Sequence, residues 1–220
     1  MRLVLGSIGI DDVTVYCPSD HPAYQYWREC CIDSFMSIES DVGALRDKKG
    51  DYLFLISCST IIGDDIRKNF RHCVVLHESD LPRGRGWSPM AWQILEGRNE
   101  ITVSAIKCAD PVDSGDIIKQ SVLRLDGTEL YQDIHRKCFE VKSALLLSVV
   151  GDQTLDRDAA DIIPQRGDAT YYRRRTPEDS RIDPNQSFAA QFDLLRVCEP
   201  RFPAFFEHRG CRYNVNLERI

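Results

Sequence analysis

Residues 73–118 read CVVLHESDLPRGRGWSPMAWQILEGRNEITVSAIKCADPVDSGDII, and the fold and the candidate site can be built outward from this stretch. The apolar run Cys73–Leu76 predicts a buried strand that leads directly into His77. A polar, turn-rich loop follows and ends at Ser88. We expect Ser88 to cap a short helix over residues 89–96, because a proline suits the first helical turn.

A second strand and a second loop complete the stretch. The alternating run Ile101–Lys107 predicts a strand, and an acidic loop centred on Asp113 follows it. A strand that ends in His77 and a later loop that carries Asp113 can bring a base and its orienting carboxylate together. Many soluble enzymes contain such a pair, so the pattern alone does not identify a reaction.

Two motifs in this stretch resemble the signatures of one enzyme family. Residues 77–89, HESDLPRGRGWSP, resemble the histidine–serine–leucine–proline–arginine–glycine–proline signature of the folate-dependent formyltransferases. Residues 112–118, VDSGDII, resemble their second signature and follow at the right separation. The segments 164–183 and 200–206 resemble the enzymes that formylate an amino sugar carried on a nucleotide. The resemblance covers roughly Tyr52 to the C-terminus, and the first fifty residues match poorly.

The resemblance implies an α/β fold. We expect an open, mostly parallel, Rossmann-like formyltransferase sheet in a catalytic domain of residues 1–151, with a small C-terminal α+β region of residues 152–220. The implied reaction transfers a formyl group from the co-substrate 10-formyltetrahydrofolate to the amino group of a nucleotide-linked 4-amino-deoxy sugar, carried on UDP or dTDP. Such sugars feed bacterial surface polysaccharides such as O-antigen.

Two alternatives to this reaction stay open. One is formyl transfer to a carrier-bound aminoacyl group or to tRNA, and the other is a nucleotide-sugar binder without catalysis. A dinucleotide-binding enzyme finds no support, because no G-x-G-x-x-G follows an early strand.

The site residues are assigned by carrying the motifs over position by position. His77 and Asp113 are the expected catalytic pair, since a histidine titrates near neutrality and an adjacent carboxylate favours its protonated form. The residues expected to bind the folate are Ser57, Ser59, Ile61, Pro82 and Asp110. The residues expected to bind the acceptor substrate are Ser79, Arg85, Gly86, Trp87, Tyr172 and Arg174. Arg85 has an alternative role as a structural anchor in a glycine-flanked turn, and no metal site is expected.

One position departs from the family pattern. The family places an asparagine two residues before the histidine, where its amide holds the formyl oxygen, and this chain has Val75 there. Side chains two apart in a strand point to one face, so Val75 is expected to face the site without a donor. Loss of one such donor typically costs about a hundred- to a thousand-fold in rate. Compensation by His77 itself, by Ser79 or by a backbone N–H is the favoured interpretation.

Composition limits the class of protein. A net charge of −6 disfavours a general nucleic-acid binder, because phosphate backbones need clustered cations. The nine cysteines are scattered without a C-x-x-C, which indicates reduced thiols rather than disulfides or a zinc site. No signal peptide or membrane-spanning run is visible, so we expect a cytoplasmic enzyme with no membrane partner. A monomer and a homodimer both stay open.

The N-terminal half is expected to alternate strands and helices. The predicted strands are Asp12–Cys17, Phe35–Ile38 and Tyr52–Ile56, the last a central parallel strand because it is continuously apolar. A helix capped by Ser19 or Asp20 should run to about Cys31. His21 beside this cap is either a wall of the substrate pocket or an exposed residue, with the exposed reading somewhat favoured.

The remaining elements lie on either side of a charged connection over residues 152–163. A strand is expected over Ile117–Leu125, and then a long helix from Asp126 to Gly151, with Glu129 completing a capping box. His135 and Lys137 lie off its apolar stripe and are expected to be solvated. The C-terminal region should contain a strand over 169–175, a helix over 187–198 with Phe188 on its apolar face, and a hairpin whose second strand, 211–217, is half-buried.

Overall fold

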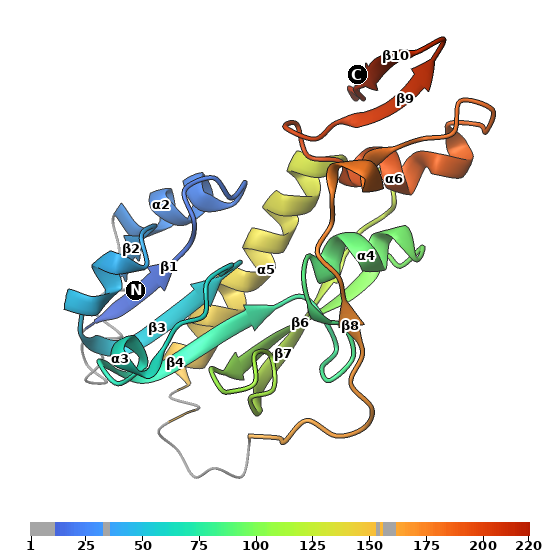
Figure 1. Cartoon of the computed structure of the whole chain (residues 1–220). Helices are drawn as coiled ribbons and strands as arrows, with labels where there is room; N and C mark the ends of the chain where they lie inside the picture. The colour runs from blue at the N-terminus through green and yellow to red at the C-terminus, as the bar shows by residue number, and fades with distance from the viewer. Residues whose placement is uncertain (1–11, 33–35, 153–154, 156–161) are drawn as a thin grey trace.

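The computed structural model describes residues 12–32, 36–152, 155 and 162–220. It is built around a six-stranded sheet of order β2-β1-β3-β4-β6-β7 with helices against it (Figure 1). The strands are β1 (Val13–Tyr16), β2 (Met36–Glu39), β3 (Gly50–Ile56), β4 (Phe70–His77), β5 (Arg85–Gly86), β6 (Glu100–Lys107), β7 (Ile117–Arg124), β8 (Tyr171–Tyr172), β9 (Ala204–His208) and β10 (Cys211–Val215). The helices are α2 (Tyr24–Ile32), α3 (Asp64–Arg67), α4 (Pro89–Leu95), α5 (Tyr131–Gly151) and α6 (Phe192–Val197), with short 3-10 turns η1 (Gly43–Asp47), η3 (Pro177–Ser180) and η4 (Ala189–Gln191).

The sheet is parallel over β2, β1, β3 and β4, and β6 and β7 then pair with it antiparallel. This mostly parallel sheet confirms the predicted α/β class. In β3 the five residues Tyr52–Ile56 are all buried, as expected for a central strand covered on both faces. The parallel strands β1, β3 and β4 end at the same edge of the sheet, which is where open α/β folds bind their ligands.

The side-chain alternation of the strands divides the interior into two cores. Tyr52, Phe54 and Ile56 of β3 face the larger core, which includes side chains of α2 and α5. Leu53 and Leu55, one position out of step, face the smaller core with side chains from η1 and α3. Full burial of one such side chain stabilises the fold by about 1.5–3 kcal/mol. The alternation therefore lets helices pack against both faces of the sheet.

Helix α5 carries the predicted apolar stripe but begins later than predicted. Ile134, Cys138 and Leu145 are buried in the larger core. The helix begins at Tyr131 rather than Asp126, because the Glu129 carboxylate accepts the backbone N–H groups of Asp126 and Gly127 and holds these residues in a turn. The capping contact foreseen from the sequence therefore forms, but in the turn before the helix.

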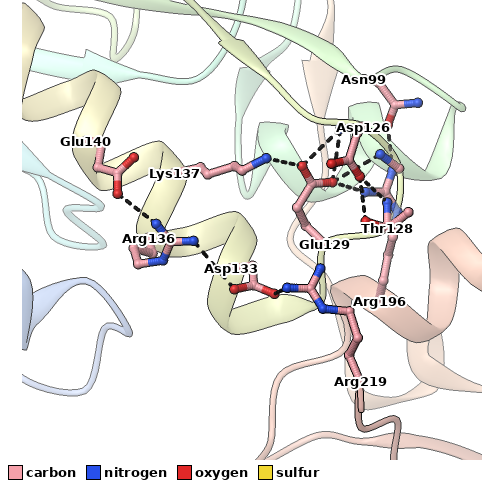
Figure 2. A network of polar contacts seen from close by, with 11 residues as sticks. Asn99, Asp126, Thr128, Glu129, Asp133, Arg136, Lys137, Glu140, Arg196 and Arg219 are labelled. Atoms are coloured by element: carbon pink, nitrogen blue, oxygen red, sulfur yellow. Dashed lines mark hydrogen bonds and ion pairs between the residues drawn. The ribbon is translucent and has the colours of Figure 1, made fainter.

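A network of polar contacts around Glu129 explains this turn (Figure 2). Glu129 is buried and pairs with Lys137. Its second oxygen lies 3.8 Å from Nη1 of the buried Arg196, which also donates to Asn99 Oδ1 over 2.9 Å. The prediction that Lys137 is merely solvated is wrong, since it neutralises a buried carboxylate. The network anchors α6 of the C-terminal region to the start of α5.

The C-terminal region returns to the sheet domain at several points. β8 pairs parallel with β5, which follows the His77 loop. α6 packs against α4, and its Val197 belongs to the larger core. Beyond it, the β9–β10 hairpin projects away from the sheet (Figure 1). The domain division at residue 152 stays a prediction.

Five other details differ from the sequence-based predictions. The strand foreseen over 169–175 is only the two residues of β8, and β10 is exposed over residues 211–214 rather than half-buried. Phe188 is 64% exposed rather than packed. Helix α2 begins at Tyr24, after a turn. Ser88 is the predicted cap position of α4, but it has left-handed φ and makes no side-chain capping bond.

Two further results concern the second strand and the lengths of the helices. Phe35, the first residue of the predicted second strand, lies outside the described residues, and β2 covers the rest of that prediction. Within the described part of the chain, no helix is long and apolar enough to cross a membrane.

Candidate active site

A cavity of about 970 Å³ lies at the carboxyl ends of the parallel strands. Its walls come from the loop after β1, the loop Ser57–Ile62 after β3, the end of β4, the start of α4, the loop Lys107–Asp113, the start of α5 and the C-terminal region. This volume is at the upper end of ordinary ligand pockets. The sheet therefore opens into a site that accommodates large ligands.

His77 lies at the end of β4, is 6% exposed and lines this cavity. Its Nε2 lies 2.9 Å from the carbonyl oxygen of Gly84. A carbonyl oxygen can only accept, so Nε2 carries the hydrogen in this contact. In the neutral ring, Nδ1 then keeps its lone pair and is the atom that can take up a proton.

Asp113 supplies the carboxylate beside that atom. Its Oδ1 lies 3.7 Å from His77 Nδ1, and both side chains are buried. Its Oδ2 accepts the backbone N–H of Gly86 over 2.9 Å, so the carboxylate is fixed in place. Asp113 itself has φ of 59°, a left-handed conformation that non-glycine residues adopt rarely and mainly where the surroundings impose it.

A half-buried glutamine, Gln165, holds the Asp113 loop in place. Gln165 Nε2 donates to the carbonyl oxygens of Asp113 and Gly115, each over 2.8 Å. Its Oε1 accepts from Arg85 Nη2 over 2.6 Å, and Arg85 Nη1 donates to Tyr171. Arg85 does not line the cavity, so its contacts match the alternative role of a structural anchor.

An ion pair lies directly beside His77. Glu78, the next residue, pairs with Lys142 of α5, whose side chain is 3% exposed. Burial alone would raise the pKa of Glu78, but the Lys142 ammonium and His77 hold it at about 2. The carboxylate is therefore charged at neutral pH, and it fixes the end of β4 against α5.

Two further histidines face each other across the cavity. The rings of His21, in the loop after β1, and His135, on α5, lie 5.6 Å apart edge to face, and both line the cavity. Burial lowers the pKa of His21 to about 4 and that of His135 to about 3, so both are neutral near pH 7. The pocket-wall reading of His21 is thus the one that the structure supports, and the prediction of a solvated His135 is wrong.

The mouth of the cavity has an aromatic and cationic wall. Trp87 is 40% exposed, and the guanidinium of Arg174 lies 4.9 Å from its ring centroid. Tyr171, Arg175 and Arg201 also line the cavity. Such a wall can stack an aromatic base and pair with phosphate oxygens.

The structure brings together most, but not all, of the residues proposed from the sequence. Those that line the cavity are His77, Asp113, Ser57, Ser59, Ile61, Asp110, Gly86, Trp87 and Arg174. Four lie outside its lining, namely Pro82, Ser79, Arg85 and Tyr172. Ser79 is 1% exposed, and Tyr172 stacks on Trp92 and donates to Glu96. In the alternating pair 171–172, the residue that faces the cavity is therefore Tyr171.

Sequence reasoning missed three groups that shape the site. Gln165 gave no signal, because its partners are more than fifty residues away in the chain. Glu78 and Lys142 did give one: Lys142 falls four residues after Cys138, inside the apolar stripe of α5, where an unpaired lysine would be costly. Arg175, inside the arginine run, lines the cavity together with Arg174.

The comparisons with known proteins agree with this fold. Residues 34–150, just over half of the chain, match the family described as formyl transferase, so the chain belongs to that family. A solved methionyl-tRNA formyltransferase from Clostridium thermocellum is 26% identical, over 96% of this chain and 93% of that one, with a TM-score of 0.74.

Two other solved structures share the fold at lower identity. A 4-N formyltransferase from Francisella tularensis is 17% identical over 96% of this chain and 99% of that one, with a TM-score of 0.69. HypX from Aquifex aeolicus in complex with tetrahydrofolic acid is 14% identical over 93% of this chain and 37% of that one, with a TM-score of 0.73. By its family match the chain is an N-formyltransferase, and the co-substrate of this family is 10-formyltetrahydrofolate.

The cavity fits this folate. Ile61 and Val112 are 74% and 54% exposed, and both lie on loops that line the cavity. Large apolar side chains in such positions are covered when a flat aromatic ring packs against them. When bound, the folate supplies the formyl group, and the protein supplies the pocket that holds it.

Proposed function

We propose that this enzyme transfers the formyl group of 10-formyltetrahydrofolate to the amino group of a 4-amino-deoxy sugar linked to UDP or dTDP. The observation that carries the proposal is the wall of Trp87, Tyr171 and Arg174 at the cavity. A nucleotide base can stack on these rings, and the diphosphate can pair with Arg174, Arg175 and Arg201. The sugar amine would then reach inward towards His77.

The residues of the site divide the chemistry among them. His77 Nδ1 accepts the proton that the amine loses as it forms its bond to the formyl carbon. Asp113, fixed by Gly86, stabilises the imidazolium that results. Ser57, Ser59, Ile61 and Asp110 are proposed to bind the folate, and Gly86 and Trp87 the sugar nucleotide.

A second candidate acceptor is an aminoacyl group on tRNA or on another carrier. It is favoured by the 26% identity to the methionyl-tRNA formyltransferase over most of both chains. The net charge of −6 weakens it, since a tRNA backbone needs an uncompensated basic surface.

The product of the sugar reaction would serve surface-polysaccharide synthesis in the cytoplasm of a bacterium.

Thermal shift with nucleotides tests the recognition part of this proposal. UDP or dTDP should raise the melting temperature, because a ligand that binds only the folded state stabilises it, and ADP should do less. Trp87→Ala and Arg174→Ala should each remove most of the shift, while Arg124→Ala, an exposed arginine paired with Glu100 on the outer sheet edge, should leave it intact. Equal shifts with every nucleotide would indicate phosphate binding alone, and no shift would favour the carrier-bound acceptor.

A further inference from the structure

Ser57 and His77 lie at the same, carboxyl edge of the sheet. β3 ends at Ile56, one residue before Ser57, and its partner β4 ends at His77. Both residues line the cavity, and Ser57 is exposed. A hydroxyl group therefore lines the same cavity as the proposed proton acceptor.

The backbone of Ser57 has a conformation that the fold imposes. Its φ is 50°, in the left-handed region. In the described part of the chain, four non-glycine residues have positive φ, and three of them, Ser57, Ser88 and Asp113, line this cavity. Such conformations are costly for a non-glycine residue and cluster at functional sites. The strain at Ser57 thus points to the same site as the strain at Asp113.

The hydrogen bonds of His21 fix which way the Ser57 hydroxyl donates. The backbone N–H of Ala23 donates to His21 Nδ1 over 3.2 Å, so Nδ1 carries no hydrogen. In this tautomer Nε2 carries it and donates to Ser57 Oγ, which lies 2.9 Å away. The oxygen of Ser57 is then an acceptor towards His21, and its own hydrogen is left to donate into the cavity.

The reaction needs a donor at this place. As the amine attacks, the formyl oxygen gains negative charge, and a hydrogen-bond donor aimed at that oxygen stabilises it. Val75 is on the same strand as His77, two residues earlier, and lines the cavity without a donor. Ser79 is buried outside the cavity lining, so it does not take this role.

We propose that the Ser57 hydroxyl is a catalytic residue that donates to the formyl oxygen, and that His21 is the positioning residue that orients it. Formation of the C–N bond moves the carbonyl electron pair onto this oxygen, where Ser57 holds it. The pair returns when the bond to the folate nitrogen breaks, and the proton that His77 took from the amine passes to that nitrogen, so tetrahydrofolate leaves with its N–H restored. The assignment holds for any amine acceptor, so it stands apart from the sugar proposal.

Kinetics of variants test this role. Ser57→Ala should lower kcat about a hundred-fold or more, with KM for the acceptor changed less than about three-fold, as for the loss of an oxyanion donor. Ser37→Ala is the control, because its hydroxyl also has a partner, Thr14, but lies on β2 away from the cavity; it should match the wild type. Unchanged kcat in Ser57→Ala would overturn the proposal.

Rescue distinguishes a donor from a structural serine. When Val75→Asn is added to Ser57→Ala, kcat should rise at least ten-fold above that of Ser57→Ala alone, because the amide offers a new donor from the neighbouring strand. His21→Ala should lower kcat about three- to ten-fold in the wild type and have no further effect in Ser57→Ala, since coupled residues are not additive. Absence of rescue, or additive effects of the two substitutions, would overturn the assignment.

A binding measurement tests the contact without any acceptor. The probe is 10-formyl-5,8-dideazafolate, a stable formyl-bearing analogue, compared with 5,8-dideazafolate, which lacks the formyl group. Ser57→Ala should bind the first about three- to ten-fold more weakly and the second unchanged, as expected for one hydrogen bond. Equal loss for both analogues would mean that Ser57 holds the folate body, and no loss for either would mean no contact; each result contradicts the proposal.

Discussion

His77 Nδ1 and Asp113 Oδ1 lie 3.7 Å apart, a distance longer than a hydrogen bond, while the other ring nitrogen of His77 donates to the Gly84 carbonyl. The ring is therefore held in the tautomer whose Nδ1 lone pair is available for a proton. Asp113 is close enough to stabilise the imidazolium once it forms. This geometry supports the general-base role proposed for His77.

Replacement of either member of this pair should abolish transfer without unfolding the protein. His77→Ala should lower kcat about 10²- to 10⁴-fold, the usual contribution of a general base. Asp113→Ala should be comparably inactive, because the imidazolium loses its counter-charge. Both variants should keep their nucleotide-induced thermal shift. Near-normal turnover in either one would show that the pair is not the catalytic base.

Val75→Asn in the otherwise unchanged enzyme tests whether the donor position is already filled. If Ser57 supplies the donor, an added amide has no partner in a partly buried position, which costs roughly 1–3 kcal/mol. We expect a lower melting temperature and no gain in kcat. A large rise in kcat would instead show a site that had lost its donor without replacement.

The ion pair between Glu78 and Lys142 should carry a measurable part of the stability. Lys142→Met leaves the Glu78 carboxylate without its partner in a buried position, and such changes typically cost about 3–5 kcal/mol. Chemical unfolding at neutral pH measures this loss. The control is Lys48→Met, whose pair with Glu39 is more exposed and should contribute about 1 kcal/mol or less. Similar values for the two variants would contradict the role of the buried pair.

The same pair predicts a defined pH dependence. The pKa of Glu78 falls from 4.5 to about 2 in the folded protein. The unfolded chain therefore binds this proton first as pH falls, so the stabilisation is complete above about pH 4.5 and is lost progressively towards pH 2. In Lys142→Met this acid-dependent loss should be absent, so the difference in stability between wild type and variant should shrink as pH falls. A difference that stays constant from pH 6 to pH 3 would contradict the assignment.

The parts of the fold that the sequence predicted are those set by local pattern. Each of three elements has a hydrophobic pattern that can be recognised within a short window of sequence: a continuous apolar run in β3, an alternation in β6 and an apolar stripe in α5. The start of α5 could not be recognised in this way, because Glu129 is engaged by Arg196 of α6, a contact that exists only after α6 packs. Local capping rules cannot include such distant partners.

The candidate site divides in the same way. His77 and Asp113 could be proposed from the sequence because each lies in a contiguous motif. The sequence could not decide between Tyr171 and Tyr172, nor settle the role of Arg85. Both depend on the parallel pairing of β5 with β8, in which Arg85 lies opposite Tyr171, 86 residues later in the chain. His135 was misjudged because it lies beside the apolar stripe and faces the cavity instead of solvent.

The most direct test of the central claim is a comparison of acceptors. The purified enzyme, with 10-formyltetrahydrofolate, is given a UDP-linked 4-amino sugar, a dTDP-linked 4-amino sugar and methionyl-tRNA in separate reactions, and tetrahydrofolate release and the mass of the formylated product are measured. We predict that kcat/KM for a nucleotide-linked sugar exceeds that for methionyl-tRNA by at least a hundred-fold, and that the product carries the formyl group on the sugar nitrogen. Preferential formylation of methionyl-tRNA, with the sugars left unmodified, would contradict the account.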